Sequence, residues 1–168
     1  MAAILSLLGL LATTSIGVAV VHAESNNAPR TTATSQDDPT PHRLKAVFIV
    51  GPTNSLTQSN LADAESLAVV AESYGMDVRR VYFPHATWAN VLANIQGANL
   101  VVYMGHGYGW PSKYTSVLTE SRQDGMGLNT YDGSGPTQYT YYGANLLKQY
   151  VTLAPNAVVF LNHLCYSA

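Results

Sequence analysis

Cysteine is nearly absent from this sequence of 168 residues, which contains only Cys165. A lone cysteine excludes a disulfide within the chain, so its thiol is free, bridges two chains or binds a metal. It follows an apolar run in the closing stretch VVFLNHLCYSA. A thiol in that position is either a small packed hydrophobe or a nucleophile.

Positive charge is also scarce. The chain has eight Lys and Arg against ten Asp and Glu, for a formal net charge of -2. The basic residues form no stripe along the chain, and this excludes the electrostatic footprint of a nucleic-acid-binding protein. We therefore expect no nucleic-acid partner.

The first 23 residues contain neither Lys nor Arg and are almost entirely apolar. They end in Val21-His22-Ala23, which places small residues where signal peptidase cleaves. The segment predicts a secretory signal peptide and a secreted or cell-surface protein. Its length and its lack of a preceding positive charge leave a retained anchor as the alternative. If the signal is cleaved, we expect no stable membrane span.

Residues 24–42 are rich in Ser, Thr, Asn, Asp and Pro and have few apolar side chains. Such a composition predicts a disordered linker or a pro-segment. The folded domain is therefore expected to occupy residues 43–168.

Short apolar runs alternate with helical periodicity along this domain. Strands are predicted at residues 44–50, 77–83, 98–104 and 156–162. Helices are predicted at about residues 61–74, 88–95 and 142–151. Residues 108–138 show little periodicity, which predicts a long functional or disordered loop. The order of elements predicts an α/β domain with a mostly parallel sheet, and the continuous apolar strands predict helices on both of its faces.

Polar residues and glycines mark the predicted helix ends. Ser55 or Ser59 is expected to cap the first helix and Thr87 the second, and Gly75 and Gly97 end them.

Two strands end in residues with reactive side chains. His106 follows the third predicted strand and Cys165 follows the fourth. Sites in open parallel sheets form outside the carboxyl ends of the strands, so neighbouring strands would bring imidazole and thiol together. Histidine can then take the thiol proton and stabilise the thiolate. The N–H groups of Gly107 and Cys165 can form an oxyanion hole, since Gly107 has no Cβ to keep a carbonyl away.

The motifs VVYMGHG and VVFLNHLCYSA resemble the His-Gly and Cys motifs of the caspase-like cysteine peptidases, which include caspases, metacaspases, gingipains and CHAT domains. From position 106 to position 165 the separation is 59 residues, near that of caspases. The resemblance implies a three-layer α/β/α fold and peptide-bond hydrolysis. It implies that Cys165 is the nucleophile, His106 the base and Gly107 an oxyanion-hole donor. No cofactor or metal is expected, and the partner is a peptide or protein substrate.

The chain ends at Ala168, whereas the fold of that family continues beyond the nucleophile. We therefore expect only the N-terminal part of such a domain. Its fourth strand would then be an apolar edge.

Two other functions remain open. A catalytically inactive binding module would use the loop between Tyr103 and Tyr142, which holds seven of the eleven tyrosines and Trp110, to recognise glycan or peptide. A zinc hydrolase would use His106, His163 and Cys165 as ligands, joined by Asp124 or Asp132.

Other polar residues have weaker interpretations. Asp124, Asn129 and Asp132 stand among glycines as a possible calcium set, without the spacing of an EF-hand. His85 is expected to be a surface loop residue. Asn162 is expected to be a satisfied strand-end residue or, alternatively, the group that orients the catalytic histidine.

Overall fold

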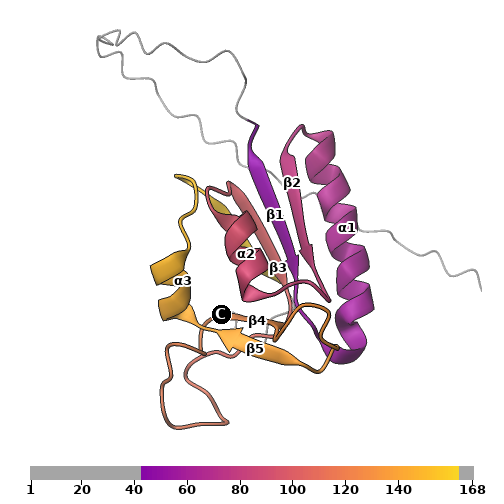
Figure 1. The fold of residues 1–168 in the computed structure, drawn as a ribbon. Helices are drawn as coiled ribbons and strands as arrows, with labels where there is room; N and C mark the ends of the chain where they lie inside the picture. The colour runs from indigo at the N-terminus through magenta and orange to yellow at the C-terminus, as the bar shows by residue number, and fades with distance from the viewer. Residues whose placement is uncertain (1–42, 163–168) are drawn as a thin grey trace, which may run out of the picture. The chain divides into compact units, whose positions relative to one another are not determined.

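The computed structural model describes residues 43–162 (Figure 1). The predicted signal peptide and linker lie outside this range, as do His163 and Cys165. The described residues form an α/β domain with a parallel main sheet, which confirms the coarse fold class. Between residues 43 and 162, no helix has the length and hydropathy needed to cross a membrane.

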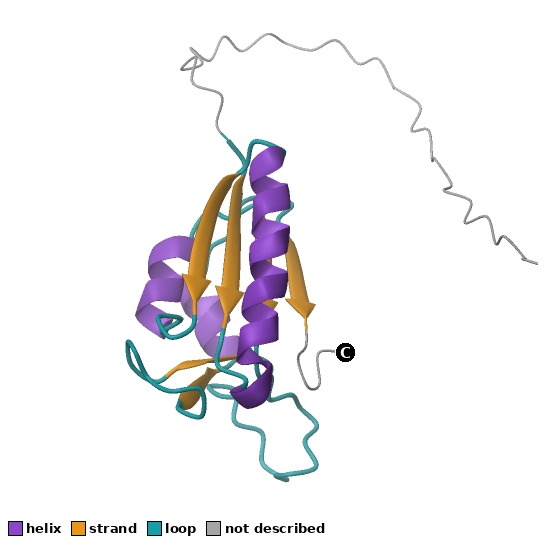
Figure 2. Ribbon diagram, turned by 90° about the vertical axis from the view of Figure 1, so that its right-hand side faces the viewer, coloured by secondary structure: helices purple, strands orange, loops and turns teal. Residues whose placement is uncertain are grey.

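The main sheet has four parallel strands in the order β2-β1-β3-β6. Their bounds are β1 Lys45–Val50, β2 Asp77–Tyr82, β3 Leu100–Met104 and β6 Val158–Asn162. The chain places β2 on one side of β1 and then β3 on the other, so the strand order reverses between β1 and β3. All four strands point toward the same end of the domain (Figure 2). Such a reversal is where open α/β sheets bind ligands, outside the carboxyl ends of the strands.

Helix α1 (Thr57–Ser73) covers one face of the sheet through small side chains (Figures 1 and 2). Ala64, Ala68 and Ala71 are buried against Phe48 and Val102. Alanines at this contact let the helix approach the sheet closely. A short 3-10 helix, Asn54–Leu56, precedes α1.

Helix α2 (Trp88–Ile95) packs on the opposite face. Val91 and Ile95 enter a core with Val47, Val101 and Tyr103. The segment directly after α3 (Ala144–Tyr150) also packs against this core, through Val151 and Leu153. The two faces of β1 and β3 are therefore buried, as their continuous apolar sequences predict.

Strand β6 differs from β1 and β3 because its side chains are exposed. Val158, Val159, Phe160 and Leu161 expose between 44% and 58% of their surface. Helices α1 and α2 pack on opposite faces of the sheet, as predicted, but they contact β1, β2 and β3, and no helix covers β6 among the described residues. The expectation of an apolar edge strand is confirmed.

The long loop predicted at residues 108–138 is irregular over most of its length, and the prediction is wrong only where a strand interrupts it at Met126–Asn129. Strands β4 (Met126–Asn129) and β5 (Tyr139–Tyr142) pair antiparallel in a second, two-stranded sheet. The third helix consequently starts at Ala144, two residues later than predicted. Met126 and Leu128 of β4 are buried in the same core as the α2 side chains. Their burial holds the hairpin against the main sheet.

The predicted helix caps are right for α2 and wrong for α1. The Thr87 side chain accepts a hydrogen bond from the N–H of Asn90 at 3.3 Å. Helix α1 starts after Leu56 with no side-chain cap, because the 3-10 turn precedes it. The Ser59 hydroxyl donates to the Leu56 carbonyl instead. Gly75 and Gly97 follow their helices with φ of 79° and 68°, a conformation that favours glycine.

Candidate active site

The register of β3 and β6 determines which residues lie side by side at the carboxyl edge of the sheet. Met104, the last residue of β3, is paired with Asn162, the last residue of β6. The prediction that these strands are neighbours is confirmed. His106 lies two residues beyond Met104, and Cys165 lies three residues beyond Asn162. The structure thus brings both strand ends together, while the thiol itself lies outside the described residues.

The backbone of His106 is held by two groups from different elements. Its carbonyl accepts hydrogen bonds from the Tyr103 hydroxyl and from the N–H of Gly127, each at 2.9 Å. The Tyr103 hydroxyl also lies 2.9 Å from the Gly127 carbonyl. Tyr103 is fully buried, and burial raises the pKa of its hydroxyl well above the ordinary range. A neutral, buried hydroxyl therefore ties the end of β3 to β4.

This close approach explains two glycines. A Cβ on Gly105 would lie 2.1 Å from the Tyr103 hydroxyl oxygen. A Cβ on Gly127 would lie 3.0 Å from the Cβ of His106. A larger residue at position 105 would displace the Tyr103 ring that holds the His106 carbonyl, and one at position 127 would press on His106 itself.

The imidazole of His106 packs against the hairpin. Its ring centroid is 4.6 Å from that of Tyr139 on β5, with the rings tilted by 38°. Its Nε2 atom is buried and has no hydrogen-bond partner among the described residues. Burial lowers the pKa of His106, because charging the ring would cost desolvation without a compensating partner. The neutral ring that results is the form a general base requires.

The N–H of Gly107 is available for a ligand. Gly107 is opposite Met126 in an isolated antiparallel bridge, beside the hydrogen bond from Gly127 to His106. Within residues 43–162, the Gly107 N–H donates to no protein acceptor. This geometry is compatible with the predicted role as an oxyanion donor.

A pocket of about 590 Å³ opens beside His106 and Gly107. The residues that line it besides these two are Tyr108, Lys113, Tyr114, Arg122 and Tyr141. The Tyr108 and Tyr141 ring centroids are 5.2 Å apart, and those of Tyr139 and Tyr141 are 5.5 Å apart. The tyrosine-rich stretch thus supplies walls of the pocket.

Lys113, Arg122 and Tyr141 line the pocket but do not stand out in the sequence. Residues 139–142 read YTYY, and such aromatic and β-branched residues favour a strand. That composition could have indicated the hairpin. For Lys113 and Arg122, nothing in the local pattern indicates which way the loop turns.

His85 and Asp132 form a separate exposed pair. His85 Nδ1 lies 2.8 Å from Asp132 Oδ1, with 63% and 67% of the two side chains exposed. The prediction of a surface histidine is confirmed.

The residues considered as a calcium set lie in different surroundings. Asp132 pairs with His85. The Oδ1 atom of Asp124 accepts a hydrogen bond from the Trp110 N–H, and Asn129 is buried and donates to Ser134. The three residues of the calcium set thus have different partners.

No group of three His, Cys, Asp or Glu side chains that could hold a metal occurs in the described part of the chain. His163 and Cys165 of the proposed zinc set lie outside that part. Asn162, at the end of β6, is exposed, and no hydrogen bond joins it to His106 among the described residues.

Comparison of the chain with protein-family models, with curated proteins and with solved structures found no match.

Proposed function

We propose that the chain is part of an exported, caspase-like cysteine endopeptidase with a three-layer α/β/α fold and a His106–Cys165 dyad. The observation that carries the proposal is the pairing of β3 with β6 in the register Met104 to Asn162. Paired strands lie about 4.8 Å apart, so we expect the chain to leave both strands at the same edge of the sheet. Export is proposed from the signal-like residues 1–23.

The chemistry follows from groups at this edge. The Cys165 thiol gives its proton to His106, and the thiolate attacks the scissile carbonyl carbon. The N–H groups of Gly107 and Cys165 donate to the oxyanion that forms. The imidazolium then protonates the leaving amine, and the C–N bond breaks to leave a thioester. Water hydrolyses the thioester with His106 again acting as the base, which restores the thiol.

The environment of His106 suits the first step. Burial lowers its pKa, so the imidazole is neutral and can accept the thiol proton at neutral pH. A thiolate beside the resulting imidazolium would stabilise its charge, which burial otherwise penalises. The pair is therefore expected to ionise together, and the thiol pKa should fall below its ordinary value of about 8.5.

Alkylation of Cys165 in the full-length protein tests the dyad. The rate of reaction with iodoacetamide, followed by mass spectrometry across pH, should rise well below pH 8.5 (the ordinary thiol value) in the wild type. His106→Ala should move that rise toward the ordinary value. His85→Ala is the matched control, since it removes an exposed histidine at the end of β2 and should change nothing.

An ordinary thiol profile in both the wild type and His106→Ala would overturn the dyad. Peptide hydrolysis that is abolished by Cys165→Ala would complete the case for an endopeptidase.

A second candidate is an inactive binding module of the same fold. The aromatic walls of the pocket, Tyr108, Tyr114 and Tyr141, favour it. Ligand binding that survives Cys165→Ala, in a protein that cleaves no peptide, would support this function over the first.

A further inference from the structure

The side chain of His106 contacts an aromatic ring where a catalytic histidine usually has a hydrogen-bonding partner. In most nucleophile–histidine pairs a third group orients the base through a hydrogen bond. The hydrogen bonds from Tyr103 and Gly127 reach the His106 carbonyl, and Nε2 has no partner among the described residues. Resting on the proposed dyad, we propose that Tyr139 is its positioning residue, whose ring holds the imidazole in the orientation that meets the Cys165 thiol.

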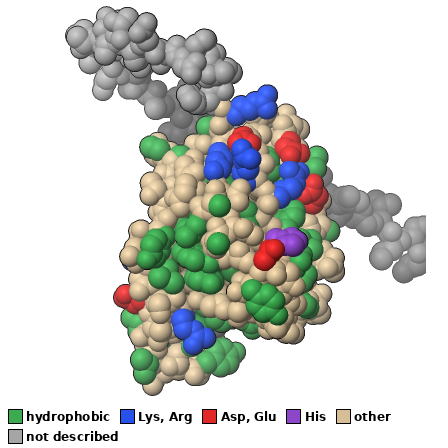
Figure 3. All heavy atoms as spheres, viewed as in Figure 1, with side chains coloured by type: hydrophobic (Ala, Val, Ile, Leu, Met, Phe, Trp, Pro, Cys, Tyr) green, Lys and Arg blue, Asp and Glu red, His purple; other side chains and the backbone are tan. Residues whose placement is uncertain are grey.

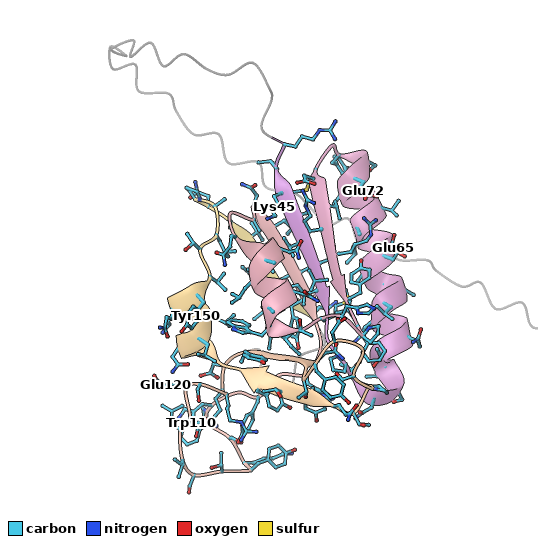
Figure 4. All side chains as sticks on the ribbon, viewed as in Figure 1. Lys45, Glu65, Glu72, Trp110, Glu120 and Tyr150 are labelled. Carbon is cyan, nitrogen blue, oxygen red and sulfur yellow. The ribbon has the colours of Figure 1, made fainter. Side chains whose placement is uncertain are left out.

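Carboxylates and amides, the usual orienting groups, lie elsewhere in the described part of the chain. No Asp, Glu, Asn or Gln of residues 43–162 lines the pocket beside His106. Asp132 instead bonds the imidazole of His85 at 2.8 Å, and Figure 3 shows a histidine beside an acidic side chain on the surface. The acidic residues labelled in Figure 4 lie along α1 and below α3. The arrangement that orients His85 is therefore not repeated at His106.

The backbone contacts of His106 do not by themselves determine where its ring points. Hydrogen bonds to the carbonyl fix the backbone and leave the side-chain torsions with several staggered choices. The ring centroids of His106 and Tyr139 are 4.6 Å apart and the planes are tilted by 38°, a separation at which aromatic rings attract each other. Rotation of the imidazole would break this contact, so the tyrosine restricts the choice of rotamer.

Tyr139 is itself held on a regular element, as a positioning residue must be. It is the first residue of β5 and is paired with Asn129, a fully buried residue of β4. Tyr141 follows on the same face of β5, because side chains alternate along a strand. The rings of Tyr139 and Tyr141 meet edge to face with centroids 5.5 Å apart. The hairpin and the neighbouring ring therefore brace Tyr139 against His106.

Gly127 makes room for these rings. It is paired with Tyr141 in the ladder between β4 and β5. A Cβ at this position would lie 3.0 Å from the Cβ of His106 and 3.3 Å from Cε1 of Tyr141. The missing side chain thus allows the imidazole and the tyrosines to lie on one face of the hairpin.

The hairpin does not depend on Tyr139 for its attachment to the domain. Tyr142, on the other face of β5, stacks on Trp88 with centroids 4.7 Å apart and packs against the core. Met126 and Leu128 are buried in the same core. Substitution of Tyr139 should therefore leave the hairpin in place and act mainly on His106.

Alkylation of Cys165 by iodoacetamide across pH tests the positioning role in the full-length protein. Tyr139→Ala should lower the rate at neutral pH about tenfold and move its rise toward the ordinary thiol pKa of about 8.5. Tyr139→Phe keeps the ring and should restore most of the wild-type rate. Tyr131→Ala is the matched control, because this tyrosine of the same hairpin is exposed, and it should leave the profile unchanged.

Two further measurements separate orientation from folding. Tyr139→Leu keeps apolar volume on the hairpin without a flat ring, and it should show the same loss of rate as Tyr139→Ala. In protein with Cys165→Ala, NMR follows the His106 ring alone. Removal of the Tyr139 ring should expose the imidazole and raise its pKa toward 6.5, because burial is what lowers it.

Wild-type alkylation profiles in both Tyr139→Ala and Tyr139→Leu overturn the positioning role and leave the dyad standing. A loss in Tyr139→Phe as large as that in Tyr139→Ala also overturns it, because the ring is then not the operative group. An unchanged thiol profile in His106→Ala is a different result, since it overturns the dyad and the positioning role together.

Discussion

His106 is the residue on which the proposed chemistry depends, and two features of its surroundings support that role. Its backbone is fixed by Tyr103 and Gly127, while its buried Nε2 has no partner among the described residues. An unpartnered buried nitrogen costs free energy, so a structure that keeps one usually gains something from it. A proton acceptor held in place and left without a partner is what a general base requires.

Burial of His106 should make the stability of the domain depend on pH. Its pKa is lowered from 6.5 in the folded state, so the unfolded chain binds more protons between the folded pKa and about 6.5. The contribution to folding is full above pH 6.5 and is lost as pH falls toward the folded pKa. Urea unfolding between pH 5 and 8 should therefore show a loss of stability on acidification that is smaller in His106→Gln.

His85→Gln provides the control for this titration, because His85 is exposed and outside the core. It should retain the wild-type pH profile apart from any contribution of its pair with Asp132. Identical profiles for the wild type and His106→Gln would contradict the burial of the ring.

At the scale of elements, α1 rests on the sheet through alanines. Ala68 is fully buried among Phe48 and its neighbours. Ala68→Leu would force a larger side chain into this contact and should destabilise the domain by about 1–3 kcal/mol. Thermal or urea unfolding measures the change.

Ala62→Leu is the matched substitution on the same helix, at an exposed position. It should alter stability by no more than about 0.5 kcal/mol. Equal effects of the two substitutions would show that α1 does not pack on the sheet through Ala68.

Strands β1 and β3 could be predicted from the sequence because their burial determines their apolar composition. Continuous apolar runs at β1 and β3, and a run at β6 of the same kind, require no tertiary information to recognise. The hairpin β4–β5 could not be predicted this way. Met126 and Leu128 are isolated apolar residues in a Gly- and Ser-rich stretch, and only their contact with the core below α2 makes them strand residues.

The candidate site, too, could be predicted from the sequence only in part. His106, Gly107 and the strand end at Asn162 follow from local sequence and from the rule for parallel sheets. The partners that shape the site, Tyr139, Arg122 and Lys113, arrive from a loop and a hairpin whose course depends on tertiary contacts. The sequence therefore indicates the proposed His106–Cys165 pair, which stays a prediction, and does not indicate which residues line the pocket.

At the scale of the whole molecule, the proposed function rests on how the sheet is wound. The chain visits β1, β2, β3 and then β6, and the reversal between β1 and β3 opens the carboxyl edge to a ligand. The hairpin and the loop before it gather at that end of the domain (Figure 1). The exposed strand β6 lies beside β3 and leads the chain toward the same edge.

Proximity of positions 106 and 165 is the central claim, and a short bifunctional thiol reagent tests it most directly. Full-length protein with His106→Cys carries two thiols, and treatment with dibromobimane should join them within one chain, as seen by mass spectrometry. His85→Cys has its second thiol after β2, at the edge of the sheet opposite β6, and should react without forming that bridge. Bridging to the same extent in both variants, or in neither, would contradict the account.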